Sequence, residues 1–383
     1  MIYLDHHATT PCLEVVIEQM NSFHRRNFAN IGSIHALGKN SQIAFEAIEQ
    51  NSLQKTGLSK LKLFYTSGAT ESINIAHLGL LEHCITYNKQ IITSKIEHKA
   101  TLNVLDFMQK QGVTVIYLNV DAFGRIDLDQ LRETLKQQNT ALVSFIHGNN
   151  EIGVIQDEQA CIALAKQYGA WVHMDISQSL CVQPSFKAYK EVDMLSFSGH
   201  KIYGPKGIGG LVINETSSKR LPLKPIMYGG GEGNSLKPGT HPTALAVGLC
   251  IALAECFDHA QERQKHFLDL KQYFLDQLPS ALDGWNMTGK LEHSLPHNIH
   301  LNFDGLSQDL VPHLRKIAVS SGSTCSAKSK MPSHVLTAIK MAENRAMSSI
   351  RIGLGLHNSK EHMETAVEDI AYAVKKMREK TSV

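Results

Sequence analysis

The chain has 383 residues, 43% of them hydrophobic and 19% charged, a composition ordinary for a globular protein and long enough for a large core and two domains. The net charge of +2 gives no electrostatic reason to expect a nucleic-acid or membrane partner. No apolar run approaches the ~18 residues that span a bilayer, and the first residues lack the segments of a secretory signal. We therefore expect a cytoplasmic protein.

The cysteines also favour a reducing compartment, because they are scattered, odd in number and never spaced Cys-x-x-Cys. The seven are Cys12, Cys84, Cys161, Cys181, Cys250, Cys256 and Cys325. His293 and His297 have the spacing of a helical metal site, but Pro296 lies between them and no cysteine accompanies them. We expect no metal.

Strand-like runs alternate with helical segments through the first two-thirds of the chain. The predicted strands are Leu61–Tyr65, Gln90–Thr93, Val113–Leu118, Ala141–Ile146, Trp171–Met174, Val192–Phe197 and Gly209–Ile213. The predicted helices between them are Ser72–His83, Ala100–Lys110, Leu128–Leu135 and Glu158–Tyr168. This alternation predicts an α/β fold with a large, mostly parallel sheet covered on both faces, and ligands bind such sheets outside the carboxyl ends of the strands.

The character of the chain changes near residue 250. Pro242–Leu278 predicts one long, nearly uninterrupted helix, which Pro279 should end. The elements predicted after it are a strand at Asn298–Phe303, a helix at Asp309–Arg315 and an amphipathic helix at Glu361–Glu379. We interpret residues 11–255 as a large domain, and residues 1–10 with 256–383 as a smaller α/β domain.

Lys201 is the first candidate for chemistry. It follows the strand-like Val192–Phe197 and stands among small residues and glycines, in Ser196-Phe-Ser-Gly-His-Lys201. A lysine just past a strand end can form a Schiff base with the aldehyde of pyridoxal phosphate (PLP).

Other polar residues also follow strand ends. Thr66–Ser72 opens a helix with small residues, which suits a phosphate, although a plain N-cap explains Thr66 equally well. Asp175 closes an apolar strand and needs a partner; a protonated pyridine nitrogen would serve, and an N-cap role is the alternative. Gln178 could reach the same ligand. His98 follows another strand, where a histidine is most often a surface or packed residue.

Two residues late in the chain indicate a substrate. Cys325 lies in a small polar loop with Lys328 and Lys330, and nearby cations favour a thiolate. Arg351 follows Ser348-Ser-Ile and could bind a carboxylate through both guanidinium nitrogens, although a surface salt bridge fits as well. The other six cysteines lie in apolar or helical settings that favour structural roles.

In order and spacing together, these motifs resemble the NifS/IscS-type cysteine desulfurases, PLP enzymes of the class V aminotransferase group with fold type I. The resemblance runs from Tyr3 to about Gly355. The matching blocks are Tyr3-Leu-Asp5 with Ala8-Thr-Thr-Pro11, Thr66–Ser72, Ile91–Ala100, Asn149–Gly153, Asp175–Ser179, Ser196–Gly207, Gly229–Gly231 with Gly239-Thr240, Ser320–Cys325 and Ser348–Arg351.

The resemblance implies a role for each matched residue. Lys201 would be the Schiff-base lysine, His98 would stack on the cofactor ring and take part in acid–base steps, and Cys325 would accept sulfur. Arg351 would clamp the substrate carboxylate, with Asn150 near it. Further cofactor-binding residues would be Ala69, Thr70, Asn150, Asp175, Gln178, Ser198, His200 and Thr240. Thr240 would reach the phosphate in the other subunit of an obligatory homodimer.

The activity that the resemblance implies is conversion of L-cysteine to L-alanine, with sulfur captured as a persulfide on Cys325. The sulfur would pass to an acceptor protein, for iron–sulfur cluster assembly or for thio-modification. Two alternatives stay open: a related PLP lyase or aminotransferase, such as a selenocysteine lyase, and a catalytically weak sulfur-relay protein.

The sequence departs from the family pattern near the expected entrance of the site. Glu232-Gly233 and Lys237-Pro238 replace the usual residues, and Lys237 keeps the charge of the usual arginine without its fork of donors. Asn30-Ile31-Gly32 stands where the family has an Asn-Pro turn. The chain lacks the longer C-terminal tail of iron–sulfur members, which weakens the expectation of a scaffold-protein partner.

Overall fold

The computed structural model describes residues 1–56, 61–218, 221–230, 236–322 and 331–381. The expected sulfur acceptor Cys325 and the departure Glu232-Gly233 lie outside the described residues.

A seven-stranded sheet forms the larger half of the molecule, in the order β2-β8-β7-β6-β5-β3-β4. Its strands are β2 Leu61–Thr66, β3 Gln90–Ser94, β4 Val115–Leu118, β5 Thr140–Ile146, β6 Trp171–Asp175, β7 Met194–Ser198 and β8 Gly209–Asn214. Only β8 runs antiparallel to its neighbours in this sheet. The predicted mostly parallel sheet is therefore confirmed.

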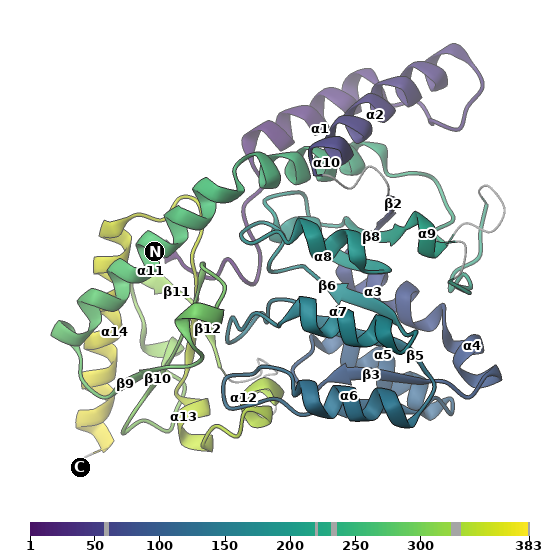
Figure 1. Ribbon diagram of the computed structural model, residues 1–383. Helices are drawn as coiled ribbons and strands as arrows, with labels where there is room; N and C mark the ends of the chain where they lie inside the picture. The colour runs from purple at the N-terminus through teal and green to yellow at the C-terminus, as the bar shows by residue number, and fades with distance from the viewer. Residues whose placement is uncertain (57–60, 219–220, 231–235, 323–330, 382–383) are drawn as a thin grey trace.

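Helices cover both faces of this sheet (Figure 1). On one side pack α6 (Leu128–Gln137), α7 (Glu158–Gln167) and α8 (Phe186–Glu191), and on the other α3 (Ala69–Leu78), α4 (Leu81–Thr86) and α5 (Lys99–Lys110). Asp127 and Asp157 begin α6 and α7 as N-caps, since their carboxylates accept backbone N–H groups of the first turn.

The single helix expected over Ser72–His83 is instead the pair α3 and α4. The break falls at Gly79, a residue of low helix propensity. The carbonyl of Gly79 accepts the N–H of Lys224 at 2.9 Å. Helix α3 thus ends where the loop containing Lys224 supplies a donor for the Gly79 carbonyl in place of a helical N–H group.

The expected helix over Pro242–Leu278 is also two helices, α10 (Thr243–Asp258) and α11 (Ala260–Ala281), bent by 69°. The bend follows from their partners: α10 packs on α1 (Glu14–Arg26) and α2 (Ala36–Lys55), whereas α11 packs on α14 (Lys360–Thr381). Pro279 does not end α11 but lies in its last turn, where a missing N–H costs a single hydrogen bond.

Among the described residues, no single helix is long and apolar enough to cross a membrane. The bent pair α10–α11 passes that test only when its two helices are taken together. Ten residues of α10 are buried inside the protein, which accounts for its apolar sequence.

A second, antiparallel sheet has the order β12-β13-β10-β9. Its strands are β12 Ser320–Ser321, β13 Ile350–Gly353, β10 Asn298–Phe303 and β9 Trp285–Met287; the short helices α12 (His334–Ala338) and α13 (Glu343–Met347) belong to the same part of the chain. The strand predicted at Asn298–Phe303 is confirmed. The helix predicted at Asp309–Arg315 is only a 3-10 turn at Val311–His313, because the chain becomes extended at Leu314 and the N–H groups of Arg315 and Lys316 donate to the Asp369 carboxylate instead.

The N-terminus lies beside this second sheet. Strand β1 (Ile2–Tyr3) pairs in parallel with β11 (Ile317–Ala318), and Leu4 exchanges backbone hydrogen bonds with Ala318 and Gly353 at 2.9 and 2.7 Å. From there, residues 5–10 run toward the end of β7. The division into domains 11–255 and 1–10 with 256–383 stays a prediction.

The carboxylate of Asp369 on α14 fixes the start of β11. It is 3% exposed and accepts the backbone N–H groups of Arg315, Lys316 and Ile317 at 2.9, 2.8 and 3.3 Å. Since β11 pairs with β1, this carboxylate also supports the N-terminal strand.

Asp369→Ala leaves these buried donors without their acceptor, and we expect it to lower the free energy of unfolding by about 2–4 kcal/mol. The matched control is Glu368→Ala, which removes only an exposed ion pair with Lys316 and should cost about 0–1 kcal/mol. Urea denaturation followed by circular dichroism measures both variants. Equal stability of the two variants would contradict this role of Asp369.

Candidate active site

The residues singled out at strand ends meet at one edge of the large sheet. Thr66 ends β2, Asp175 ends β6 and Ser198 ends β7, and all three strands point the same way. His98 and Asn150 follow β3 and β5 at the same edge. The topology therefore gathers side chains that lie far apart in the sequence.

Lys201 ends a 3-10 turn, Gly199–Lys201, directly after β7. Its Nζ donates to the backbone carbonyl oxygens of His7 and Ala8, the second at 2.8 Å. Burial, aided by the positive charge of Arg351, lowers the pKa of Lys201 to about 8. A sizeable share of the amine is therefore neutral, and nucleophilic, near neutral pH.

The predicted phosphate residues lie together at the start of α3. The N–H of Ala69 donates to Ser198 Oγ at 2.7 Å, and Thr70 follows in the exposed first turn of the helix. A Cβ on Gly209 would lie 2.7 Å from Cα of Gly68, so only glycine allows the strand and the loop to approach this closely. Backbone N–H groups at a helix start attract an anion.

Lys237, one of the departures from the family pattern, brings a positive charge to the same helix start. Its Nζ lies 2.9 Å from Glu71 Oε1, and the other Glu71 oxygen accepts the N–H of Ser67 at 2.6 Å. Although burial raises the pKa of Glu71, the hydrogen bond from Ser67 and the contact with Lys237 lower it overall. Thr240, three residues after Lys237, is exposed.

Asp175 is 3% exposed, and its Oδ1 accepts the N–H and the hydroxyl of Ser177 at 2.9 and 2.6 Å. The alternative reading as an N-cap is wrong, because turns and not a helix follow it. His98 begins α5, with its Nδ1 accepting the N–H of Ala100 at 3.1 Å. Burial lowers the pKa of His98 against the opposing charge of Asp175, so the neutral ring carries its proton on Nε2.

Three predicted residues make contacts that the sequence did not indicate. The amide of Gln178 is bound to His7, at 2.9 Å through Oε1 and 3.0 Å through Nε2. His200 Nδ1 lies 3.2 Å from Thr9 Oγ1, and burial together with Lys201 lowers the pKa of His200 to about 4. The backbone carbonyl oxygen of Asn150, not its side-chain amide, accepts a hydrogen bond from Arg351 Nη1 at 2.9 Å.

Arg351 reaches this edge from β13 of the second sheet. Its Nη2 forms an ion pair with Asp5 Oδ1 and a hydrogen bond to Ser320 Oγ, both at 2.8 Å. Its Nε is buried and has no hydrogen-bond partner among the described residues. A buried donor without a partner suits a carboxylate ligand, so the surface salt-bridge reading does not apply here.

Sequence reasoning did not assign a role to Asp5, His7 or Ser320. No spacing motif links them to Lys201 or Arg351, because β1–β11 pairing and the second sheet bring them there. The consecutive His6 and His7 beside the matched Tyr3-Leu-Asp5 block were the one available signal.

Two of the cysteines expected to be structural contact a buried charge. Arg263 Nη1 lies 2.9 Å from Cys181 Sγ and 3.4 Å from Cys256 Sγ, and its guanidinium stacks on Tyr203. A hydrogen bond from Cys256, with the charge of Arg263, lowers the pKa of Cys181 to about 7 despite burial. Both thiols are buried, at 2% and 0% exposure, and cannot meet a substrate.

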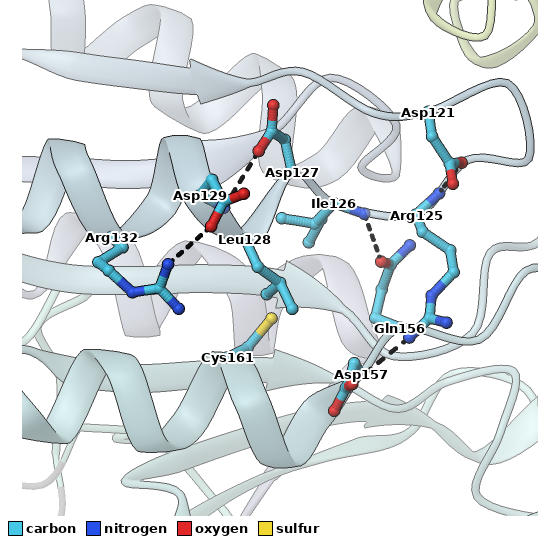
Figure 2. A pocket seen from close by; sticks show the side chains of 10 residues that line it. All are labelled: Asp121, Arg125, Ile126, Asp127, Leu128, Asp129, Arg132, Gln156, Asp157 and Cys161. Atoms are coloured by element: carbon cyan, nitrogen blue, oxygen red, sulfur yellow. Dashed lines mark hydrogen bonds and ion pairs between the residues drawn. The ribbon is translucent and has the colours of Figure 1, made fainter.

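A separate hollow of about 500 Å³ lies between α6, α7 and the loop before α6 (Figure 2). Four of the charged side chains in its wall form two ion pairs, Arg125 with Asp157 at 3.5 Å and Arg132 with Asp129 at 2.6 Å. Burial raises the pKa of Cys161 in the same wall to about 12. The hollow contains none of the residues gathered around Lys201.

The fold and the lysine after β7 define a class of proteins, the class V aminotransferases with the type I fold of PLP enzymes. The sequence pattern of the family described as aminotransferase class-V matches residues 2–365, so the chain belongs to this family. The predicted family resemblance is thereby confirmed.

The sequences of several relatives align with nearly the full length of the chain. It is 36% identical over 380 residues to the putative cysteine desulfurase IscS 1 of Bacillus subtilis, covering 98% of this chain and 99% of that one. It is 35% identical to the cysteine desulfurase IscS of Dictyoglomus turgidum, covering 98% and 95%. A solved NifS-like protein superposes with a TM-score of 0.88 at 30% identity, covering 98% and 99%.

The lowered pKa of Lys201 gives a testable pH dependence. Because the neutral amine attacks an aldehyde, the rate at which apoprotein reacts with PLP should rise with pH and level off above about 8. The visible absorbance of the lysine-bound cofactor measures that rate between pH 6.5 and 9.5. Lys201→Ala should give no band, whereas the exposed neighbour Lys206 can be replaced by alanine without loss. A rate independent of pH would contradict the assignment.

Proposed function

We propose that this protein is a PLP-dependent cysteine desulfurase that converts L-cysteine to L-alanine. One observation carries the proposal: the buried lysine after β7 lies close enough to Asp175 and Arg351, from distant parts of the chain, for both to act on its charge at the edge of the large sheet. The full-length relatives that carry the name cysteine desulfurase support the same activity. A solved chain described as SspA in complex with cysteine, 31% identical with a TM-score of 0.78, supports cysteine as the substrate.

The residues present fit PLP. The aldehyde would meet the Lys201 amine, the ring nitrogen would meet the buried Asp175, and the phosphate would lie against Ala69, Thr70 and Ser198 at the start of α3. PLP, when bound, takes up the electron pair left on the substrate Cα after its proton departs. His200, whose ring is held neutral, would donate or accept a hydrogen bond beside the phosphate without adding charge.

The chain's own residues bind and orient the substrate. Arg351 would receive the carboxylate through an adjacent nitrogen and its Nε, which has no partner in the part of the chain that the structure describes. The Asn150 backbone carbonyl fixes the guanidinium from one side and Asp5 from the other. The amine of Lys201, with its pKa of about 8, gives and takes protons near neutral pH. His98 presents a neutral ring with its proton on Nε2.

We infer that Cys325 is the sulfur acceptor. Its thiolate would attack the sulfur of the substrate, so that a sulfur–sulfur bond forms while the bond between that sulfur and the substrate Cβ breaks. The Cβ atom would keep the electron pair of the broken bond and take up a proton, which gives the methyl group of L-alanine. The described cysteines are poorer candidates: burial raises the pKa of Cys84 to about 11 and those of Cys161 and Cys250 to about 12. Cys181 and Cys256 are too buried to meet a substrate, and burial raises the pKa of Cys12. The persulfide would pass to an acceptor protein in iron–sulfur cluster assembly or thio-modification.

The test is alanine formation from L-cysteine by the purified PLP-loaded protein. We expect alanine from the wild type and a loss of about 100-fold or more in Cys325→Ala, since removal of a nucleophile abolishes its step. The control is Cys12→Ala, which removes a partly exposed thiol whose pKa burial raises. No alanine from the wild type, or full activity in Cys325→Ala, would refute the proposal.

We also propose that the protein is a cytoplasmic homodimer. Large apolar side chains are exposed on α1–α2 and the loop between them, including Phe28, Ile34, Leu37 and Ile43 at 75, 90, 60 and 65%. Several large apolar side chains exposed on neighbouring elements favour a protein partner, and a second copy would bury them while bringing Thr240 near the other subunit's phosphate.

Ile34→Lys combined with Leu37→Lys should therefore lower the molar mass in solution from that of a dimer to that of a monomer. Light scattering after size-exclusion chromatography measures it. Ile85→Lys on α4, half-exposed and away from this surface, is the matched control and should leave the mass unchanged. A wild type that elutes as a monomer would contradict the proposal.

A further inference from the structure

The buried side chain of His7 links Lys201 to Gln178. The amine of Lys201 rests on the carbonyl oxygens of His7 and Ala8. Gln178 is bound to His7 twice, because its Nε2 donates to the His7 carbonyl at 3.0 Å and its Oε1 lies 2.9 Å from the ring Nδ1. One carbonyl oxygen, that of His7, thus accepts from both residues.

The direction of every hydrogen bond in this network follows from its neighbours. Asn298 Nδ2 donates to the carbonyl of Glu151 at 3.0 Å, which fixes the amide orientation because a carbonyl only accepts. The same Nδ2 lies 3.1 Å from His7 Nε2, which must therefore be the acceptor. A neutral imidazole then carries its proton on Nδ1 and donates to Gln178 Oε1.

The surroundings prevent other arrangements. The His7 side chain is 1% exposed, Asn298 1% and Gln178 6%, so water does not replace these contacts. The His7 ring packs on the ring of His297 at 4.3 Å between centroids. Burial also lowers the pKa of His7 well below its usual range, which keeps the ring neutral. The Gln178 amide retains one Nε2 hydrogen for a ligand.

We propose that His7 is a positioning residue, which fixes the Gln178 amide through its ring and holds the free Lys201 amine on its carbonyl. This inference rests on the proposed function, because it concerns the amine whenever it is not joined to the cofactor. The charged groups that act on Lys201 are Arg351, Asp5 and Asp175. The neutral His7 ring adds no charge, so His7 acts on the orientation of the Lys201 amine and of the Gln178 amide.

The experiment exploits side-chain geometry. The amide nitrogen of asparagine can occupy the place of a histidine Nδ1, whereas that of glutamine reaches the place of Nε2. His7→Phe keeps a ring against His297 without a donor and should slow the reaction of apoprotein with PLP about three- to tenfold. His7→Asn should restore most of that rate, and His7→Gln should not. In the loaded enzyme, kcat for L-cysteine should fall in the same order with KM nearly unchanged.

His6→Phe is the matched control, since His6 is also buried but packs on Tyr3 at 4.8 Å between ring centroids. Should His7→Phe fail to fold, Asn298→Ser tests the same network from its other side and should also slow the reaction. Equal rates in the Phe, Asn and Gln variants, or a wild-type rate in His7→Phe, would overturn the inference. A wild type that reacts with PLP but forms no alanine refutes the proposed function instead, so the two failures are distinguishable.

Discussion

The hydrogen bonds between residues 7–10 and the turn after β7 are the contact on which the site depends. Thr10 donates to the His200 carbonyl through its N–H and its hydroxyl, at 2.9 and 3.0 Å, and the same hydroxyl accepts the N–H of Tyr203 at 2.9 Å. Lys201 lies in the chain between His200 and Tyr203, and its amine donates to the carbonyl oxygens of His7 and Ala8 in the same N-terminal segment. Lys201 is thus held by the turn after β7 on one side and by the N-terminal segment on the other.

Charge balance gives this arrangement its chemistry. A buried lysine facing an arginine is driven toward its neutral form, and Asp5 and Asp175 limit how far the shift goes. Asp5 serves both cations, since it pairs with Arg351 at 2.8 Å and also acts on Lys201. An arginine that is already oriented loses little conformational entropy when a carboxylate arrives.

Sequence predicted the large sheet well because its buried strands are short apolar runs bounded by polar strand ends, and every predicted strand in it was found. It failed where tertiary packing overrides local pattern: α10 and α11 bend because they pack on different partners, and Pro279 is tolerated in a last turn. Lys201 and Asp175 could be singled out from their positions after predicted strands, whereas Ser198 was named only through the family resemblance. His7 was not, because its role arises from contacts with Gln178 and Asn298, 171 and 291 residues away in the chain.

The pairing of β1 with β11 also sets the order of events during synthesis. Residues 2–3 leave the ribosome first, yet their partners at 317–318 follow only after roughly 15–60 s at the usual 5–20 residues per second. Until then the N-terminal segment has no strand beside it, and Arg351 does not yet exist. A nascent chain can fold its parallel sheet around Lys201 with Asp175 in place, but the positive charge of Arg351 that lowers the pKa of that lysine is added only with the second sheet. The ion pair of Arg351 with Asp5, which joins the two ends of the site, is therefore among the last contacts of the molecule to form.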